Sequence, residues 1–130
     1  MTDPIADLLT RIRNGITAEH DVVEMPGSTF KAEVTRILRE QGYIEGFEVE
    51  PARVGQTLRV RLKYTEDRRS VISGIDRLSR PGRRRYVAAT EIPKVLGGMG
   101  TTIVSTSGGV MTGHDARRAG VGGELVARVW

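Results

Sequence analysis

The sequence contains no cysteine, only two histidines and no long apolar run. The lack of cysteine excludes a disulfide framework, a thiol nucleophile and a thiolate metal site. The histidines, His20 and His114, stand in no metal-ligand spacing, so we expect neither a metal nor a cofactor. The first residues, MTDPIADLL, open with acid rather than base, so we expect neither a secretory signal nor a membrane span. These absences are typical of a soluble, cytoplasmic protein.

Positive charge is unevenly distributed along the chain, whose net charge is +4 and whose sequence pI is about 10.0. Residues 1–67 carry nine Lys and Arg against twelve Asp and Glu, a balance of −3, whereas residues 68–130 carry eleven against four, a balance of +7. Seventeen of the twenty cations are arginine, which suits bidentate phosphate contacts and stacking on bases. The second half is therefore expected to face an anionic partner.

The first half predicts the order helix, strand, helix, strand, strand. Asp3-Pro4 is typical of a helix start, and apolar residues then recur at helical spacing as far as Asn14-Gly15, a predicted stop. Ser28 is positioned to cap a second helix that ends at Gly42. Strands are predicted at residues 22–25, 44–50 and 58–64. This order fits helices packed on one face of a small sheet.

The charged stretch TEDRRS at residues 65–70 predicts a boundary between two small packed domains, residues 1–66 and residues 67–130. Beyond it the apolar runs are short and glycine is frequent, which predicts a mostly β domain with short helices. Its predicted elements are strands at 71–78 and 83–88 around a turn at 79–82, a helical turn at 91–96 capped by Thr90, strands at 101–104 and 124–130, and a helix at 114–119. The predicted fold class is α+β.

Residues 101–123 join a β-branched run to three adjacent hydroxyls, Ser105, Thr106 and Ser107, which precede the pair Gly108-Gly109. Hydroxyls at a strand end can donate to phosphate oxygens and exchange hydrogen bonds with base edges and ribose hydroxyls, while the glycines let another backbone approach closely. The alternative is a turn whose hydroxyls satisfy only local backbone groups.

An arginine-rich segment lies between Ser79 and Tyr86 (SRPGRRRY). Its cations are Arg80, Arg83, Arg84 and Arg85, and a Pro-Gly turn separates the first from the others. Arginine contacts to phosphate would supply affinity for RNA, and the ring of Tyr86 would stack on a base or sugar. The alternative is a solvated hairpin tip with Tyr86 in the core.

A lesser candidate surface for an anionic ligand lies in the first half. Its members are Asp3, Arg11, Asn14 and Lys31. Arg11 and Arg13 flank the apolar Ile12, so a solvated helix face would explain these charges equally well.

A catalytic site is not expected. Ser105, His114 and Asp115 invite comparison with a nucleophile, base and orienter, but adjacent helical side chains diverge by about 100 degrees and no G-x-S-x-G elbow is present. The glycine run at 97–102 lacks the lysine of a P-loop and precedes a strand. We therefore predict a non-enzymatic protein.

Several separated motifs occur in a fixed order along the chain. They are DPIAD at 3–7, TRIRN at 10–14, GYI at 42–44, SRPG at 79–82 with Tyr86, VLGG at 95–98, STS-x-GVMT at 105–112, Ala116-Arg117 and G-x-GGE at 120–124. Together they resemble the family of small-subunit ribosomal protein eight, of the bacterial type, over essentially the full chain. The number and order of the motifs make this resemblance specific.

The resemblance implies a structural constituent of the ribosome that is a primary binder of small-subunit ribosomal RNA. It implies contact with the central domain of that RNA, mainly through the C-terminal domain, and a role in assembling the platform of the small subunit. Expected partners are small-subunit ribosomal proteins five and twelve and, in some members of the family, the messenger RNA of their own operon. The alternative is a messenger-directed repressor or protein-interaction module that works off the ribosome.

The same resemblance matches Ser105, Thr106 and Ser107 to the family's RNA-contacting loop and Tyr86 to its aromatic contact, and it places Glu124 beside the same pocket. Gly109 is predicted to bind RNA together with them. Because a carboxylate repels phosphate, we expect Glu124 to accept hydrogen bonds from serine or arginine side chains or from a base amino group. The alternative is a purely structural role. The chain departs from the family pattern at Gly108, where a long polar or basic residue is common, and at Thr29, where lysine is common. Each departure would remove one phosphate contact, which the run Arg83-Arg84-Arg85 would offset.

Overall fold

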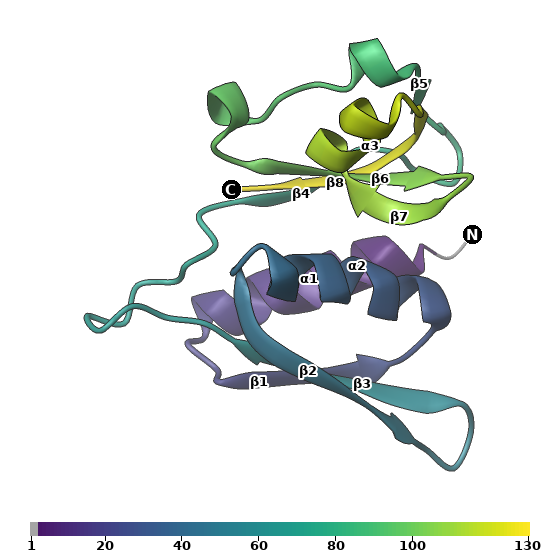
Figure 1. Ribbon diagram of the computed structural model, residues 1–130. Coiled ribbons are helices and arrows are strands. Elements are labelled where there is room, and N and C mark those ends of the chain that lie inside the picture. Colours follow the sequence, from purple (N-terminus) through teal and green to yellow (C-terminus); the bar gives the residue numbers. More distant parts are fainter. Residues whose placement is uncertain (1–2) are drawn as a thin grey trace. The chain divides into compact units, whose positions relative to one another are not determined.

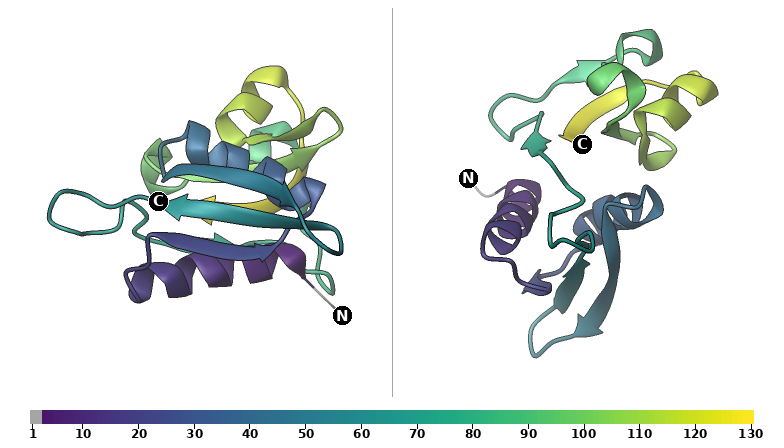
Figure 2. Two further views of the ribbon diagram at one scale, coloured as in Figure 1. Left: turned by 90° about the horizontal axis from the view of Figure 1, so that it is seen from below. Right: turned by 90° about the vertical axis from the view of Figure 1, so that its left-hand side faces the viewer.

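A computed structural model describes residues 3–130. The chain forms two compact units, one spanning Pro4–Ser73 and the other Gly74–Trp130 together with Asp3 (Figure 1; Figure 2 gives two further views). Helices and two antiparallel sheets are present in the described residues, which confirms the predicted α+β class. The domain boundary between residues 66 and 67 stays a prediction.

The unit Pro4–Ser73 is a three-stranded antiparallel sheet with two helices on one face (Figure 1). Its elements are α1 (Pro4–Thr17), β1 (Val22–Pro26), α2 (Thr29–Glu40), β2 (Ile44–Pro51) and β3 (Gln56–Leu62). The strand order β1-β3-β2 places β3 in the middle, where Leu58 and Val60 are fully buried. The predicted order helix, strand, helix, strand, strand is confirmed.

Helix α1 does not stop at Asn14-Gly15, as predicted, but continues to Thr17. Gly15 is buried, and a side chain at this position would collide with Val23 of β1. The glycine therefore permits close packing of the helix on the strand. Tertiary packing has overridden a local signal for helix termination.

Both predicted ends of α2 are confirmed. The Ser28 hydroxyl accepts a hydrogen bond of 3.2 Å from the backbone N–H of Lys31, which satisfies one free donor of the first helical turn. Beyond the helix, Gly42 has a φ of 81°, in the left-handed region that favours glycine. The chain reverses there, and the N–H of Tyr43 donates to the carbonyl oxygen of Leu38 over 2.9 Å.

The second unit is a sheet of order β4-β8-β6-β7, with β5 also paired to β8. Its elements are β4 (Ile75–Arg77), β5 (Tyr86–Val87), the 3-10 turns η1 (Ala89–Glu91) and η2 (Leu96–Gly98), β6 (Thr101–Thr106), β7 (Gly109–Thr112), α3 (Gly113–Ala119) and β8 (Gly123–Val129). Helix α3 packs on one face of this sheet. There Ala116 forms a buried cluster with Ile92, with Val104 of β6 and with Leu125 of β8.

The hairpin predicted from strands at 71–78 and 83–88 is wrong. Strand β4 has only three residues, and both β4 and β5 pair with β8 instead of with each other. The N–H of Leu78 donates to Val126, and the carbonyl of Arg85 accepts from Leu125, so residues 79–84 leave one edge of β8 and return to it. The Pro-Gly turn indicates a local chain reversal. It does not indicate with which strand the segments on either side of the turn will pair.

The helical turn predicted at residues 91–96 is also wrong. Residues 89–91 and 96–98 form 3-10 turns, and Thr90 lies inside the first of these turns, which has no side-chain cap. Ile92 is extended, with φ −66° and ψ 119°. The reason is Pro93, because a proline disfavours the helical conformation in the residue before it.

We expect Gly123→Ala to destabilise the second unit. An added Cβ would collide with the carbonyl oxygen of Ser105 on β6, and this backbone atom cannot move without displacing the strand. Overpacking of this kind costs about 1–3 kcal/mol and would lower the midpoint of urea unfolding. Gly82→Ala is the control, because a Cβ on Gly82 has no neighbour within 4 Å. Equal losses of stability in the two variants would contradict the packing argument.

Candidate nucleic-acid interface

Four side chains from four strands form a row across the sheet of the second unit. The register pairs Tyr86 of β5 with Glu124 of β8, Glu124 with Ser105 of β6, and Ser105 with Val110 of β7. Directly paired residues of antiparallel strands point to the same face. The next residues along β6 and β8, Val104 and Leu125, belong to the core under α3, so the row points away from α3.

The three hydroxyls of residues 105–107 have different surroundings. Strand β6 is longer than predicted and includes Ser105 and Thr106, so the chain reverses only at Ser107 and Gly108. The Thr106 hydroxyl donates to the carbonyl oxygen of Gly109 over 2.8 Å and accepts from the N–H of Gly108 over 3.1 Å. For Thr106 the alternative of a locally satisfied hydroxyl therefore holds. The hydroxyls of Ser105 and Ser107 have no hydrogen-bond partner within residues 3–130 and are free to bind a ligand.

The two glycines of this turn also differ. Gly109 has a φ of 112°, which requires glycine in practice. A Cβ on Gly108 would meet its nearest atoms only at 3.7 and 3.8 Å, which is ordinary contact. A glycine at position 108 is therefore not required by the packing around its Cα.

Glu124 accepts two side-chain hydrogen bonds, more than any other polar residue of the row. Its Oε2 accepts a hydrogen bond of 2.6 Å from the Ser79 hydroxyl and one of 2.9 Å from Nη1 of Arg84. Burial acts to raise the pKa of Glu124, but these two hydrogen bonds and the charges of Arg84 and Arg77 outweigh it, so the pKa lies below its ordinary value. The carboxylate is therefore ionised at neutral pH, and serine and arginine partners are present as predicted.

The arginine-rich loop contains one paired and three unpaired guanidinium groups. Arg84 forms an ion pair with Glu124, which raises the pKa of Arg84, whereas Arg80, Arg83 and Arg85 are exposed and have no side-chain partner in the part of the chain that the structure describes. The backbones of Arg80 and Arg83 exchange hydrogen bonds of 3.1 and 2.9 Å across the Pro-Gly turn. Tyr86 is 69% exposed, so the alternative that placed its ring in the core is wrong.

The chain matches the family described as Ribosomal protein S8 over residues 3–130. It is 54% identical over 130 residues to the small ribosomal subunit protein uS8 of Leifsonia xyli subsp. xyli, with 100% of this chain and 98% of that protein covered. The proteins of the same name from Corynebacterium efficiens and Solibacter usitatus are 52% and 53% identical over 130 and 129 residues, which cover 100% and 99% of this chain and 98% of each relative. The chain belongs to the ribosomal protein S8 family. It is therefore a structural constituent of the ribosome and not an enzyme, as predicted.

One important residue of this S8-family site, Ser79, was missed as a site residue by sequence reasoning, which treated it as part of a turn. Its side chain is fully buried, and its hydroxyl donates to Glu124 while accepting from the N–H of Arg85 over 3.1 Å. Ser79 thus ties the two ends of the arginine-rich loop to β8. Its position in the motif SRPG was the only available signal, because the distant partner Glu124 is set by strand pairing.

The residues predicted for the lesser surface are divided between the two units. Arg11 pairs with Asp7 over 3.0 Å, and Lys31 donates to the Pro26 carbonyl over 2.8 Å while its Nζ lies 3.6 Å from the same Asp7 carboxylate. Arg11 and Asn14 line a shallow cavity of about 440 Å³. Asp3 belongs instead to the second unit, where its carboxylate accepts from Nε of Arg77 over 3.1 Å.

Within residues 3–130, no group of three or more His, Asp or Glu side chains is arranged to hold a metal ion. No helix in this range is long and apolar enough to cross a membrane.

We expect the contribution of Glu124 to stability to depend on pH. The folded-state pKa lies below the unfolded value of roughly 4.3, so the stabilisation is complete above that pH and is lost as the pH falls through the folded-state pKa. Glu124→Gln should therefore lower the free energy of unfolding by about 1–2 kcal/mol at pH 6, and by progressively less towards pH 3, in urea titrations.

Glu45→Gln is the matched control, because Glu45 is an exposed residue of β2. Its effect should be small at every pH. A loss for Glu124→Gln that stays constant between pH 6 and pH 3 would contradict the assigned role of the ionised carboxylate.

Proposed function

We propose that this S8-family protein is a primary binder of small-subunit ribosomal RNA that contacts the central domain of that RNA and helps to assemble the platform of the small subunit. The observation that carries the proposal is the placement of three residues of the row, Tyr86, Glu124 and Ser105, beside a loop with three unpaired arginines. In this proposal residues 67–130 form the RNA-binding domain and residues 1–66 supply at most a secondary contact.

The arginine-rich loop provides attraction to phosphate. The side chains of Arg80, Arg83 and Arg85 have no partner among the described residues, so their charges are available to the RNA backbone. Arg84 is held by Glu124 and instead helps to fix the conformation of the loop. The unpaired cations therefore supply affinity and orientation, and their contribution carries no sequence information.

The row itself supports recognition of an irregular RNA helix by shape. The exposed ring of Tyr86 provides a surface for stacking on an unpaired base or a sugar. The free hydroxyls of Ser105 and Ser107 can both donate to and accept from ribose hydroxyls and base edges. Glu124 repels phosphate and accepts hydrogen bonds only, so it favours a base amino group or a 2′-hydroxyl at this point.

The resemblance also supports three finer proposals about partners. Small-subunit ribosomal proteins five and twelve are the proposed protein neighbours. The same row would bind a messenger RNA of the protein's own operon if that messenger mimics the ribosomal site. Both kinds of RNA would compete for Ser105 and Tyr86, since one surface serves both.

We expect the double variant Ser105→Ala, Ser107→Ala to bind the irregular helix of the central domain about tenfold more weakly, since two hydrogen bonds are lost. Isothermal titration with this RNA helix would measure the affinity, and urea unfolding would check that the fold is retained. Thr90→Ala, which removes an exposed hydroxyl on η1 of the same unit, is the control and should bind normally. Unchanged affinity in the double variant would refute the assignment of these hydroxyls.

We expect Arg83→Gln to flatten the dependence of log Kd on log salt concentration by about one unit of slope, because one phosphate contact is lost. The matched control is Arg53→Gln, which removes an exposed arginine between β2 and β3 of the first unit. Filter binding at several salt concentrations would measure both slopes. The same slope for both variants would place Arg83 away from phosphate.

A further inference from the structure

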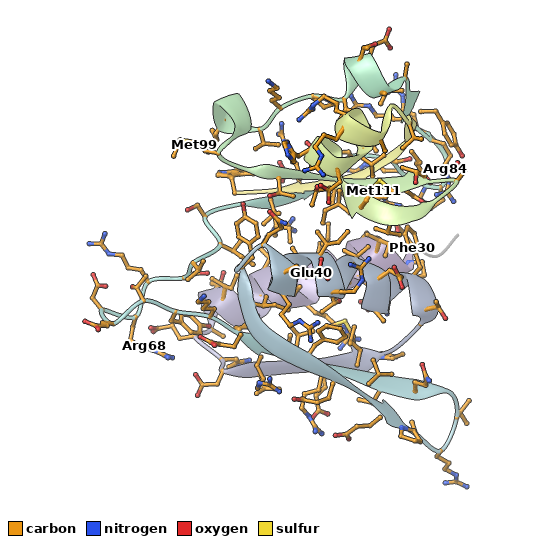
Figure 3. All side chains as sticks on the ribbon, viewed as in Figure 1. Phe30, Glu40, Arg68, Arg84, Met99 and Met111 are labelled. Carbon is orange, nitrogen blue, oxygen red and sulfur yellow. The ribbon has the colours of Figure 1, made fainter. Side chains whose placement is uncertain are left out.

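Two large apolar side chains of the second unit are open to solvent near the start of β6. Leu96 is 62% exposed and Met99 is 87% exposed, and both belong to the loop Val95–Gly100 that contains η2. Figure 3 shows Met99 pointing outward at the end of this unit opposite Arg84. Apolar side chains that gather on a surface in this way mark an interaction site more often than isolated ones do.

The loop that carries these side chains is closed by its own backbone. The carbonyl oxygen of Val95 accepts from the N–H groups of Gly98 and Gly100, each over 3.0 Å, and Leu96 accepts from Met99 over 3.2 Å. Leu96 has a φ of 49°, in the left-handed region that is unfavourable for leucine. The loop therefore holds two apolar groups in water in a strained, ordered conformation, which lowers the entropy lost on docking.

A depression lies beside the loop. It has a volume of about 290 Å³ and is lined by Lys94, Val95, Leu96, Arg128 and Trp130. The guanidinium carbon of Arg128 lies 5.3 Å from the centroid of the Trp130 ring, and Arg128 also pairs with Asp76 over 3.0 Å. Lys94 has no partner among the described residues. The depression thus combines apolar walls with a positive charge at its rim that nothing in the second unit neutralises.

We propose that the Leu96–Met99 loop and this depression dock a segment of another small-subunit protein, in which an apolar side chain is flanked by Asp or Glu. The apolar residues fit the two exposed side chains and the wall of Trp130, and the carboxylates fit Lys94. RNA fits less well, because the patch is largely apolar and offers one unpaired cation, Lys94, whereas the arginine-rich loop carries three. The proposal rests on the proposed function in so far as its partner belongs to the same subunit.

The test replaces Met99 with the photo-cross-linking residue p-benzoylphenylalanine in the full chain. The protein is assembled with small-subunit RNA and the purified set of small-subunit proteins, and the sedimented subunits are irradiated. We expect a cross-link to one protein, at a peptide with an apolar residue flanked by Asp or Glu. The same probe in place of Val54, which is 88% exposed in the first unit, is the control and should not mark that peptide.

Two substitutions test the chemistry of the contact. Leu96→Asn removes the apolar side chain and introduces a residue that tolerates the left-handed conformation. Lys94→Glu reverses the charge at the rim of the depression. Each should reduce the cross-link yield about tenfold, as expected for residues central to an interface. Both should leave the affinity for the isolated RNA helix unchanged.

The outcomes separate this proposal from the proposed function. A cross-link to RNA, or no cross-link in subunits that contain the protein, would overturn the docking surface alone. A cross-link to a peptide without acidic flanks, or one insensitive to both substitutions, would also overturn it. Failure of the unmodified protein to bind the RNA helix or to sediment with small subunits would instead overturn the proposed function.

Discussion

The pairing of β8 on both of its edges is the interaction on which the candidate site depends. One edge carries β4 and β5 in succession and the other carries β6, so residues from three distant segments meet in one row. Gly122 and Gly123 permit this approach, because a side chain on either would collide with the backbone of Val87 or Ser105. The spacing of the row then follows from the sheet, in which neighbouring strands lie roughly 4.8 Å apart.

A single carboxylate organises the basic part of this surface. Glu124 accepts hydrogen bonds from Ser79 and Arg84 through the same oxygen, and Ser79 in turn holds the backbone of Arg85. The loop is therefore anchored near both ends while its remaining arginines stay unpaired. Electrostatic attraction between Glu124 and Arg84 lowers the entropy that the loop would lose on binding a polyanion, because one of its cations is already ordered.

The sequence predicted helix ends correctly where the hydrogen bonds that form them join residues close to each other in the chain. The cap at Ser28 and the glycine stop at Gly42 are of this kind, because each depends on hydrogen bonds within one or two turns. The helix end predicted at Gly15 is wrong, because this glycine lies inside α1 and allows the helix to pack closely on Val23 of β1. The helical turn predicted at 91–96 does not form for a different, local reason, because Pro93 disfavours the helical conformation at Ile92.

The sequence by itself determined the chemistry of the candidate site, namely its hydroxyls, its arginines and its tyrosine, and it indicated the family. These are properties of composition and of short motifs. Only the tertiary structure decided which groups are free, since it engages Thr106 and Arg84 internally and leaves Ser105 and Arg83 available. The physical reason is that strand pairing is made by backbone hydrogen bonds, which are nearly the same for every residue type and leave little trace in the sequence.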